Sequence, residues 1–383
     1  MKCPRCQNTD PAWFYPGSKG WYCRRCISFG RILIEEERNP VPVEEIREGS
    51  EEYLLRYPLT PAQKVVSDAC VSHIFSTDVL LECVCGAGKT EMTVASIAAF
   101  LKLKKKVCFA IARRQVVLEV AERLGQYFPN ARVVPVCQGF TTITDGDLIV
   151  CTTHQLYRYY QTFDLLILDE PDAFPFRGDP VLHGIAASAC IGHIIYLTAT
   201  PDDYLKQGVK EGKIQKFVLS VRPHGKPIPV PVVRLGPLFL LFPELFFWLR
   251  KHTSHPRIVF VPTIAGAEVM GRILSVFFTP CKVVTSKSEN RDVLIETFRK
   301  EQKGIMVATT VLERGVTIPH ADVCVFEADH GVYDEAGLVQ MAGRAGRDFK
   351  DPTGDVLFLC RKRSDLCEAC KTSLEEANKA CVV

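Results

Sequence analysis

The chain has 383 residues, of which 47% are hydrophobic and 24% are charged. This composition excludes a globally disordered protein and, at this length, favours two or three domains with cores of their own. The 47 Lys and Arg residues against 44 Asp and Glu residues give a net charge of only +3. A general cationic excess as the basis of nucleic-acid binding is therefore excluded, and any such binding needs a local basic surface.

Two Cys-x-x-Cys pairs mark the first predicted domain, residues 1–30. Cys3 and Cys6 form one pair and Cys23 and Cys26 the other, with sixteen residues between them. Four thiolates at this spacing predict a tetrahedral zinc site on two knuckles, where the metal replaces the core that so short a segment cannot build. Because the protein fills all four positions, we expect the zinc to be structural.

The segment between the two pairs is rich in aromatic residues, and Arg24 and Arg25 follow it. Bases of single-stranded DNA can stack on such rings while arginines contact phosphates. The same residues also suit a purely structural role, because aromatic side chains cap small zinc ribbons and cations offset a negative tetrathiolate. The sequence leaves both interpretations open. The aromatic residues are Trp13, Phe14, Tyr15, Trp21 and Tyr22.

Cysteine usage and the first residues predict where the protein is located. No apolar segment follows the start Met1-Lys2-Cys3, so no secretory signal is visible. We expect a reducing, cytoplasmic location, without structural disulfides among the 17 cysteines. The longest apolar stretch, Leu235–Leu249, contains two prolines and Glu244. It is shorter than the about 20 residues of a membrane helix, so we expect no membrane span.

An acidic, proline-containing connector, residues 31–58, separates the cysteine module from a predicted α/β domain at residues 59–222. In this domain short apolar runs alternate with helical patterns such as Thr90–Leu103. Continuously apolar strands are buried on both faces, which is typical of a parallel sheet. The predicted strands include Lys106–Ile111, Asp147–Val150 and Asp164–Leu168.

The loop Cys85-Gly86-Ala87-Gly88-Lys89-Thr90 follows an apolar segment and opens a predicted helix. This context predicts a phosphate-binding P-loop. Glycines let backbone N–H groups face phosphate oxygens, and the helix N-terminus adds partial positive charge. Lys89 is predicted to reach the β and γ phosphates and the Thr90 hydroxyl to bind Mg²⁺. Cys83 stands where the strict pattern has its first glycine.

Two acids follow the predicted strand Leu165–Leu168. Ligands of open α/β sheets bind at the carboxyl ends of strands, which is where Asp169 and Glu170 stand. We therefore expect Asp169 to hold Mg²⁺ and Glu170 to orient and deprotonate the water that attacks the γ phosphate.

A proline-rich stretch, Arg222–Pro231, interrupts the pattern, and we expect a linker at residues 223–240. The alternation then resumes, which predicts a second α/β domain at residues 241–383. Its predicted strands are Arg257–Val261, Ile305–Ala308 and Val323–Phe326, with a helix at Asp292–Lys300. The predicted fold class is thus α/β, with two tandem parallel-sheet domains after an N-terminal Cys₄ zinc ribbon.

A third cysteine pair, Cys367 and Cys370, has only Cys360 and Cys381 nearby as further metal ligands. A second metal site is one interpretation. The simpler one is a C-terminal helix whose cysteines pack inward.

Segments along most of the chain resemble the motifs of superfamily 2 helicases and translocases, in that family's order. They are Leu59–Gln63 (Q motif), the P-loop (I), Ala110–Arg114 (Ia), Cys151–Gln155 (Ib), Asp169–Asp172 (II), Leu197–Thr200 (III), Val259–Thr263 (IV), Ala308–Val316 (V) and Gln340–Arg347 (VI). The resemblance implies two RecA-like domains that face each other across ATP, and it implies that Gln63 reads the adenine.

Motifs V and VI imply a contribution of the second domain to ATP hydrolysis. By resemblance Gly315 contacts ATP, Gln340 belongs to the catalytic set, and Arg344 and Arg347 complete the site when the cleft closes. An arginine finger of this kind is worth about 10³ to 10⁵ in rate. Hydrolysis would thus be coupled to domain closure.

The resemblance also implies that motifs Ia, Ib, IV and V contact the backbone of a nucleic-acid strand. We expect Arg113, Thr153, Thr263 and Thr309 to make these contacts. Binding of this kind varies little with base sequence and weakens as salt rises.

The match narrows to one family. Asp169–Pro175, Arg222–Pro231, Ala328-Asp329-His330 and the N-terminal cysteines resemble the bacterial late competence family ComFA. This resemblance implies a cytoplasmic ATPase that drives uptake of transforming DNA as a single-stranded DNA translocase or helicase. It also implies other competence proteins as partners, namely the phosphoribosyltransferase-like product of the same operon and the membrane DNA channel, at the inner face of the membrane.

Three alternatives stay open. An RNA helicase would share these motifs, since none of them reads the sugar. A replication-restart helicase also combines such a motor with cysteine-bound zinc, although there we expect the zinc within the second half. A zinc-ribbon scaffold switched by nucleotide would hydrolyse ATP slowly and without response to nucleic acid.

Overall fold

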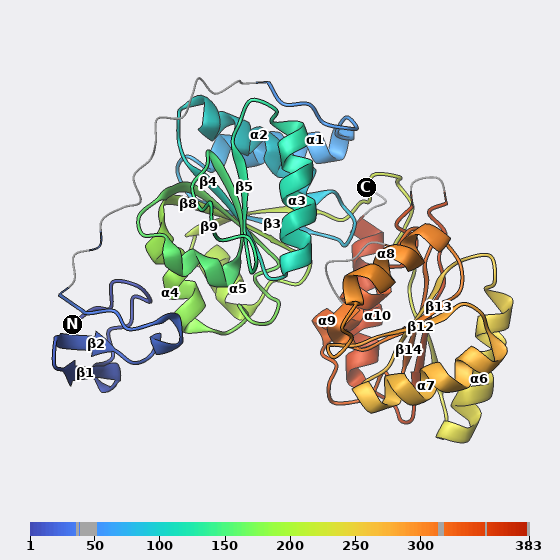
Figure 1. Ribbon diagram of the computed structural model, residues 1–383. Coiled ribbons are helices and arrows are strands. Elements are labelled where there is room, and N and C mark those ends of the chain that lie inside the picture. Colours follow the sequence, from blue (N-terminus) through green and yellow to red (C-terminus); the bar gives the residue numbers. More distant parts are fainter. Residues whose placement is uncertain (36–37, 39–51, 313–317, 349–350, 381–383) are drawn as a thin grey trace. The chain divides into compact units, whose positions relative to one another are not determined.

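The computed structural model describes residues 1–35, 38, 52–312, 318–348 and 351–380. The chain forms two compact units (Figure 1). The first comprises Met1–Cys83 and Gly88–Leu219, and the second comprises Val84–Ala87 and Ser220–Val383. Most of the expected connector, residues 31–58, lies outside the described residues.

The N-terminal residues form a small β-hairpin between two single 3₁₀ turns. Strands β1 (Phe14–Gly17) and β2 (Gly20–Cys23) pair antiparallel, with Tyr15 opposite Tyr22. The turn η1 (Pro11–Trp13) precedes them and η2 (Ile27–Phe29) follows. Cys23 is the last residue of β2 and Cys26 precedes η2, so the second cysteine pair spans the turn that leaves the hairpin.

The rest of the first unit is built on a seven-stranded sheet of parallel neighbours, in the order β5-β6-β4-β7-β8-β3-β9. The predicted parallel sheet is confirmed, and every residue of β4 is buried, as its apolar run requires. The strands are β3 (Asp78–Cys83), β4 (Val107–Ile111), β5 (Val133–Val136), β6 (Leu148–Thr152), β7 (Phe163–Asp169), β8 (Cys190–Thr198) and β9 (Ile214–Leu219).

Among the described residues of this unit, α1 precedes the sheet, and four further α-helices and one 3₁₀ helix lie between its strands. The helix predicted at Thr90–Leu103 is confirmed as α2, one residue earlier at each end. The helices are α1 (Pro61–His73), α2 (Lys89–Lys102), α3 (Arg114–Tyr127), η3 (Thr153–Arg158), α4 (Pro180–Ala189) and α5 (Asp203–Lys210). Because β8 lies between β7 and β3, the carboxyl ends of these three strands share one edge of the sheet. That edge is where α/β proteins bind ligands.

The second unit contains a six-stranded sheet of parallel neighbours, in the order β10-β15-β14-β11-β13-β12. Its strands are β10 (Val232–Leu235), β11 (Arg257–Phe260), β12 (Cys281–Val284), β13 (Ile305–Ala308), β14 (Asp322–Phe326) and β15 (Val356–Cys360). Its helices are α6 (Leu238–Lys251), α7 (Ile264–Phe277), α8 (Arg291–Glu301), η4 (Thr310–Leu312), α9 (Glu335–Ala342) and α10 (Asp365–Ala380).

Alternate residues of the central strand β11 enter two different cores. Ile258 and Phe260 belong to one buried cluster, and Val259 and Val261 to another. Side chains alternate between the two faces of a strand, so both faces of this sheet are covered. This explains why Arg257–Val261 is continuously apolar after its first residue.

The proline-rich stretch is part of the second unit. Ile228 is buried in its core, and its backbone N–H and carbonyl are both hydrogen-bonded to the Asn378 side chain of α10, at 2.8 and 2.9 Å. The segment expected as a linker, residues 223–240, also contains the edge strand β10 and the start of α6. Prolines are compatible with such a path because an extended edge segment leaves few N–H groups to satisfy.

No helix in the described ranges has both the length and the apolar character needed to cross a membrane. The longest apolar stretch of the sequence forms α6, which packs one side against the core through Leu241, Leu245 and Leu249.

Candidate ATP-hydrolysis site and cysteine cluster

The P-loop leads from β3 into α2, as the sequence predicts. Lys89 is the first residue of α2 and Gly88 is its N-cap, with φ +79°. Residues other than glycine rarely adopt this left-handed backbone conformation. A Cβ on Gly88 would also lie 2.5 Å from Nε2 of Gln63. The backbone conformation therefore favours glycine at the start of this helix, and the Gln63 amide lies directly against it.

Gln63 of the Q motif lies beside the P-loop and also caps α1. The Gln63 Oε1 atom accepts from Thr60 N–H at 2.9 Å, and Thr60 Oγ1 accepts from Gln63 N–H at 3.3 Å, which forms a capping box. The Gln63 side chain is buried. Its position next to Gly88 accords with the expected role near the nucleotide, and the contact with adenine stays a prediction.

The two motif II acids stand at the end of β7. Burial and the nearby Glu170 charge raise the pKa of Asp169 to about 7, while the Lys89 charge acts in the opposite direction. Lys89 begins the helix that follows β3 and Asp169 ends β7, so both residues stand at the carboxyl edge of the same parallel sheet. Glu170 has φ +54°, which is uncommon for a non-glycine residue and typical of functional sites. Its N–H donates to the carbonyl of Leu197 at 2.8 Å.

We expect the affinity of the nucleotide site for Mg²⁺ to fall as the pH falls through about 7. A carboxyl must lose its proton to hold the metal, so below the raised pKa of Asp169 the Mg²⁺ affinity falls by up to about tenfold per pH unit. Titrating Mg²⁺ against binding of a fluorescent ADP analogue from about pH 6 to about pH 8 measures this dependence. The Glu170→Gln variant is the control, because removing one repelling charge moves the midpoint to lower pH. Equal Mg²⁺ affinity across the range would contradict the assignment.

Asp172 joins motif II to motif III, a link that sequence reasoning did not assign to it. Its carboxylate is buried and accepts hydrogen bonds from the hydroxyls of Thr198 and Thr200, the latter at 2.7 Å. Thr200 N–H in turn donates to Thr198 Oγ1 at 2.9 Å. A buried carboxylate with two hydroxyl donors fixes the loop after β8 relative to the end of β7.

Arg123 of α3 is a second residue that no motif identified. Its Nη2 donates to Thr90 Oγ1 at 3.2 Å, and its Nη1 lies 3.4 Å from the Glu91 carboxylate. The Tyr127 hydroxyl donates to the same carboxylate at 3.2 Å. The Thr90 hydroxyl expected to bind Mg²⁺ is thus held by an arginine from the next helix, which only the tertiary structure brings near.

The two strand-contact residues predicted in the first unit differ in exposure. Arg113 is the partly exposed N-cap residue of α3. Thr153 is only 2% exposed, so its side chain does not face solvent in this conformation. The next residue, His154, is exposed. The sequence did not predict that Thr153 is buried. Thr153 is the first residue of the 3₁₀ helix η3, and a five-residue motif is too short to indicate which side of that helix faces the core.

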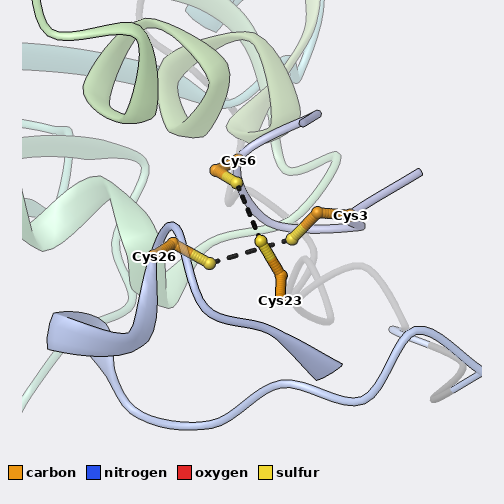
Figure 2. Close-up of side chains that lie close together, drawn as sticks. All are labelled: Cys3, Cys6, Cys23 and Cys26. Carbon is orange, nitrogen blue, oxygen red and sulfur yellow. Dashed lines mark hydrogen bonds between the residues drawn. The ribbon is translucent and has the colours of Figure 1, made fainter. Parts of the chain in front are cut away.

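The four N-terminal cysteines form one buried cluster (Figure 2). Cys3 Sγ lies 3.8 Å from Cys26 Sγ, and Cys6 Sγ lies 3.8 Å from Cys23 Sγ. All four sulfurs lie within 4.8 Å of one another. Four ligands at about 2.3 Å from a tetrahedral Zn²⁺ are about 3.8 Å apart, so the arrangement is compatible with zinc. The separations exclude disulfide bonds, which need about 2.05 Å.

The cysteine hairpin packs against α4 and η3 of the same unit. A Cβ on Gly184 would lie 1.9 Å from the carbonyl oxygen of Cys6, and Ser188 Oγ donates to the carbonyl of Pro4 at 2.8 Å. The Phe29 ring lies 5.4 Å from that of Tyr157. The cysteines also share one buried cluster with Leu182 of α4. The hairpin is therefore an integral part of the first unit.

We expect Gly184→Val to displace the hairpin from α4 and lower thermal stability by several degrees. The new side chain would overlap the backbone of Cys6, and overpacking of this kind costs about 1 to 3 kcal/mol. Metal content and unfolding temperature are the measurements, with zinc expected to stay bound because the four thiols are untouched. Gly125→Ala is the matched control, since nothing lies within 4 Å of its added Cβ. An unchanged melting temperature in Gly184→Val would contradict the docking.

The C-terminal cysteines pack inward, which supports the simpler of the two interpretations. Cys367 and Cys370 lie on α10 and are at most 1% exposed. Cys367 Sγ lies 3.6 Å from Cys360 Sγ, and within the described ranges these sulfurs do not join a group of three or more metal-ligating side chains. Cys381 lies outside the described residues.

The motif IV and V residues of the second unit follow β11 and β13. Thr263 is exposed and caps α7, its Oγ1 accepting from Gly266 N–H at 3.0 Å. Thr309 is 7% exposed and follows the end of β13. Gly315 and its neighbours in motif V lie outside the described residues. The two threonines lie at the carboxyl edge of the sheet.

Motif VI forms the end of α9 and the turn that follows it. Gln340 and Arg344 are 2% and 3% exposed. Arg347 is partly exposed, and its Nε donates to the carbonyl of Gly343 at 2.8 Å. The predicted arginines therefore lie in one short turn, with Arg347 the more accessible of the two.

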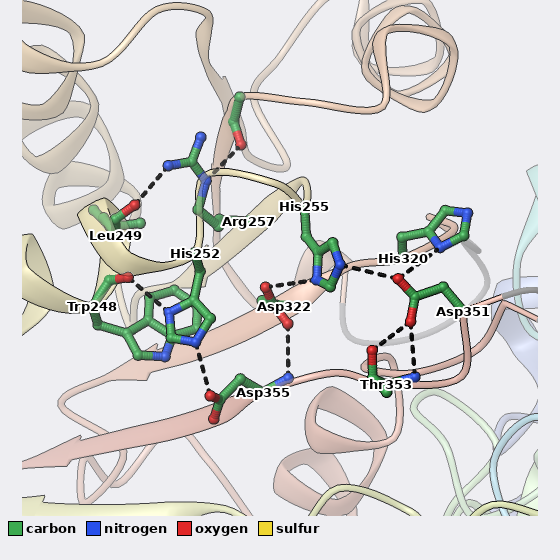
Figure 3. Close-up of polar contacts among 11 residues, drawn as sticks. Trp248, Leu249, His252, His255, Arg257, His320, Asp322, Asp351, Thr353 and Asp355 are labelled. Carbon is green, nitrogen blue, oxygen red and sulfur yellow. Dashed lines mark hydrogen bonds and ion pairs between the residues drawn. The ribbon is translucent and has the colours of Figure 1, made fainter.

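A histidine and aspartate network ties the segment after motif VI to the amino edge of the second sheet (Figure 3). His255 lies between the carboxylates of Asp322 and Asp351, at 3.0 and 3.2 Å. His320 Nδ1 lies 3.9 Å from the same Asp351 carboxylate. Burial raises the pKa of Asp322. These histidines hold Asp351, four residues after Arg347, against the amino end of β14.

The comparisons with known proteins define the class. The type III restriction enzyme res subunit family matches residues 56–203, and the helicase conserved C-terminal domain family matches residues 239–348. The structure of Saccharomyces cerevisiae Dbp5 bound to RNA and ADP BeF3 is similar with a TM-score of 0.63 at 16% identity, covering 84% of this chain and 92% of that one. With two RecA-like parallel-sheet domains and this motif set, the protein is an ATP-hydrolysing superfamily 2 helicase or translocase.

Two relatives specify the family. The chain is 34% identical over 374 residues to competence protein ComFA of Streptococcus pneumoniae, covering 93% of this chain and 85% of the relative. It is 31% identical over 380 residues to competence protein ComFA of Bacillus subtilis, covering 93% and 81%. The chain belongs to the ComFA family, as the resemblance seen in its motifs predicts.

Proposed function

We propose that this protein is an ATP-driven translocase that moves along single-stranded DNA and drives the uptake of transforming DNA in natural competence. The proposal is carried by one observation above all, the grouping of Lys89 with Asp169 and Glu170 at the ligand-binding edge of the first sheet. Membership of the ComFA family supports the biological setting.

In this proposal the residues of the first unit hold and activate ATP. Lys89 and the N–H groups at the start of α2 bind the phosphates, and Gln63 contacts the adenine. Thr90 and Asp169 hold Mg²⁺, which offsets the phosphate charge when bound. Glu170 orients the attacking water and accepts its proton.

The second unit completes hydrolysis in this proposal. Arg347 and Arg344 stabilise charge on the transferred phosphoryl group, with Gln340 and Gly315 in the same motif set. Closure on ATP and opening after phosphate release would alternate the grip on the strand. Arg113, Thr153, Thr263 and Thr309 contact DNA phosphates, and the buried Thr153 does so through its backbone.

The four-cysteine cluster holds one structural Zn²⁺ in this proposal. The sulfur separations fit a tetrahedral ion, and the hairpin contributes to the core of the first unit. Zinc supplies the local stability that the short hairpin lacks. DNA contact by its exposed rings of Trp13, Tyr15 and Trp21 stays an open alternative to a purely structural role.

Substrate class is tested by the ATPase rate. We expect single-stranded DNA to raise the rate strongly, duplex DNA and matched RNA to raise it weakly, and rising salt to reduce the stimulation. RNA is the main alternative, since the similar Dbp5 structure contains RNA, whereas the similar RecG structure contains a DNA junction. Stronger stimulation by RNA would overturn the DNA assignment, and a slow rate unaffected by any nucleic acid would favour a nucleotide-switched scaffold.

We further propose a cytoplasmic location at the inner face of the membrane. The partners would be the phosphoribosyltransferase-like product of the same operon and the membrane DNA channel. This part of the proposal is supported by the family alone, and co-purification of these proteins with the chain from competent cells tests it.

A further inference from the structure

Arg222 is a buried arginine just after β9, the last strand of the first sheet, and it belongs to the second unit. Its side chain is 2% exposed and is among the largest fully buried side chains of the described residues. Burying a guanidinium is unfavourable unless its donors are satisfied and its charge is offset. The hydrogen-bond partners of Arg222 therefore show what offsets the cost of burying its charge.

The two terminal nitrogens of Arg222 bind three backbone carbonyls of motif VI. Nη1 donates to Ala345 and Gly346, and Nη2 donates to Gly343, each at 2.8 Å. These carbonyls follow the carboxyl end of α9, where helices leave carbonyl groups without partners and carry partial negative charge. The guanidinium of arginine is planar, permanently charged and carries several N–H donors in a fixed geometry. It can therefore donate to three neighbouring carbonyls at once, which no other side chain does as well.

The same contacts connect Arg222 to the arginine expected to act on ATP. Gly343 O accepts from Nη2 of Arg222 and also from Nε of Arg347, both at 2.8 Å. Burial and the nearby Arg347 charge lower the pKa of Arg222 to about 10, so its guanidinium stays charged at neutral pH. The turn that carries Arg344 and Arg347 is thus held at its backbone by a third arginine.

We propose that Arg222 is a positioning residue of the ATPase, which fixes the motif VI turn so that Arg347 is presented to the nucleotide in one orientation. This inference rests on the proposed role of Arg347. Arg222 itself is buried and acts through backbone carbonyls, three of them in residues 343–346 and a fourth on Cys85, which accepts from its Nε at 2.9 Å. Its loss would remove the Arg222 donor from the carbonyls of Ala345 and Gly346 and one of two donors from that of Gly343, so the turn would hold the Arg347 side chain less firmly.

A double-mutant cycle on ATP turnover tests the inference. We expect Arg222→Gln to lower kcat at saturating single-stranded DNA by about 10- to 100-fold with little change in KM for ATP, since small misplacements of a catalytic group have effects of this size. The Arg222→Gln, Arg347→Ala double variant should be no slower than Arg347→Ala alone, because the first residue acts through the second. Exposed Arg234 of β10 gives the control Arg234→Gln, expected to turn over like the wild type.

Each outcome separates this inference from the proposed function. Wild-type kcat in Arg222→Gln with a slow Arg347→Ala, or losses that multiply in the double variant, would overturn the positioning role alone. Wild-type kcat in Arg347→Ala would overturn the role of Arg347 and the inference with it. If Arg222→Gln does not fold, the same cycle is run with Arg222→Lys, which keeps the charge but cannot reach all three carbonyls and should show a smaller, equally non-additive loss.

Discussion

Replacing Lys89 with alanine is expected to reduce ATP turnover to background. Lys89 begins α2, where its charge adds to the partial positive charge of the helix end, and it acts electrostatically on Asp169. No other residue of the P-loop carries a positive charge, so the variant loses the group that neutralises the β and γ phosphates. Phosphate release at saturating Mg-ATP and single-stranded DNA is the measurement.

The control for Lys89→Ala is Lys102→Ala, at the other end of the same helix. Lys102 is the exposed last residue of α2, so the two variants remove the same group from one helix at opposite ends. We expect Lys102→Ala to retain turnover and both variants to unfold at similar temperatures. Turnover in Lys89→Ala at the wild-type rate would refute the assigned nucleotide site.

Arg347→Ala is expected to lower kcat by about 10³-fold while nucleotide binding persists. An arginine finger stabilises charge that develops only in the transition state, so its loss appears in kcat more than in KM. Arg347 is partly exposed and Arg344 is buried in the same turn, so we propose Arg347 rather than Arg344 as the finger. Steady-state turnover and binding of a fluorescent ATP analogue separate the two effects.

Arg272→Ala is a suitable control for Arg347→Ala. Arg272 is exposed on α7 in the same unit, so the substitution removes a surface charge with no motif assigned to it. Equal kcat values for Arg347→Ala and Arg272→Ala would show that the motif VI arginine does not act in hydrolysis.

Parts of the fold that depend on local sequence pattern could be predicted. The apolar runs at residues 107–111 and 305–308 became central strands because a strand buried on both faces must be apolar throughout. The glycines and lysine at the start of α2 could be assigned since the P-loop is a local structure. The four-cysteine cluster likewise followed from spacing alone.

Other features depend on contacts between distant segments and could not be predicted. Arg123 reaches Thr90 from the next helix, Asp172 binds two threonines from β8 and beyond, and Arg222 binds carbonyls more than a hundred residues away. None of these pairs has a characteristic spacing. Proline content suggested a linker around Ile228, whereas its apolar side chain and the Asn378 contacts place the segment in the core.

The central claim is that ATP binds to the P-loop lysine and motif II acids of the first unit. The two units then close, and the motif VI arginines of the second unit reach the bound nucleotide. Small-angle X-ray scattering of the full chain, with and without ADP–beryllium fluoride and single-stranded DNA, measures this closure most directly. We predict a smaller radius of gyration when both ligands are bound than when either is absent. An identical radius of gyration in all states of the wild type, under conditions where both ligands bind, would contradict the account.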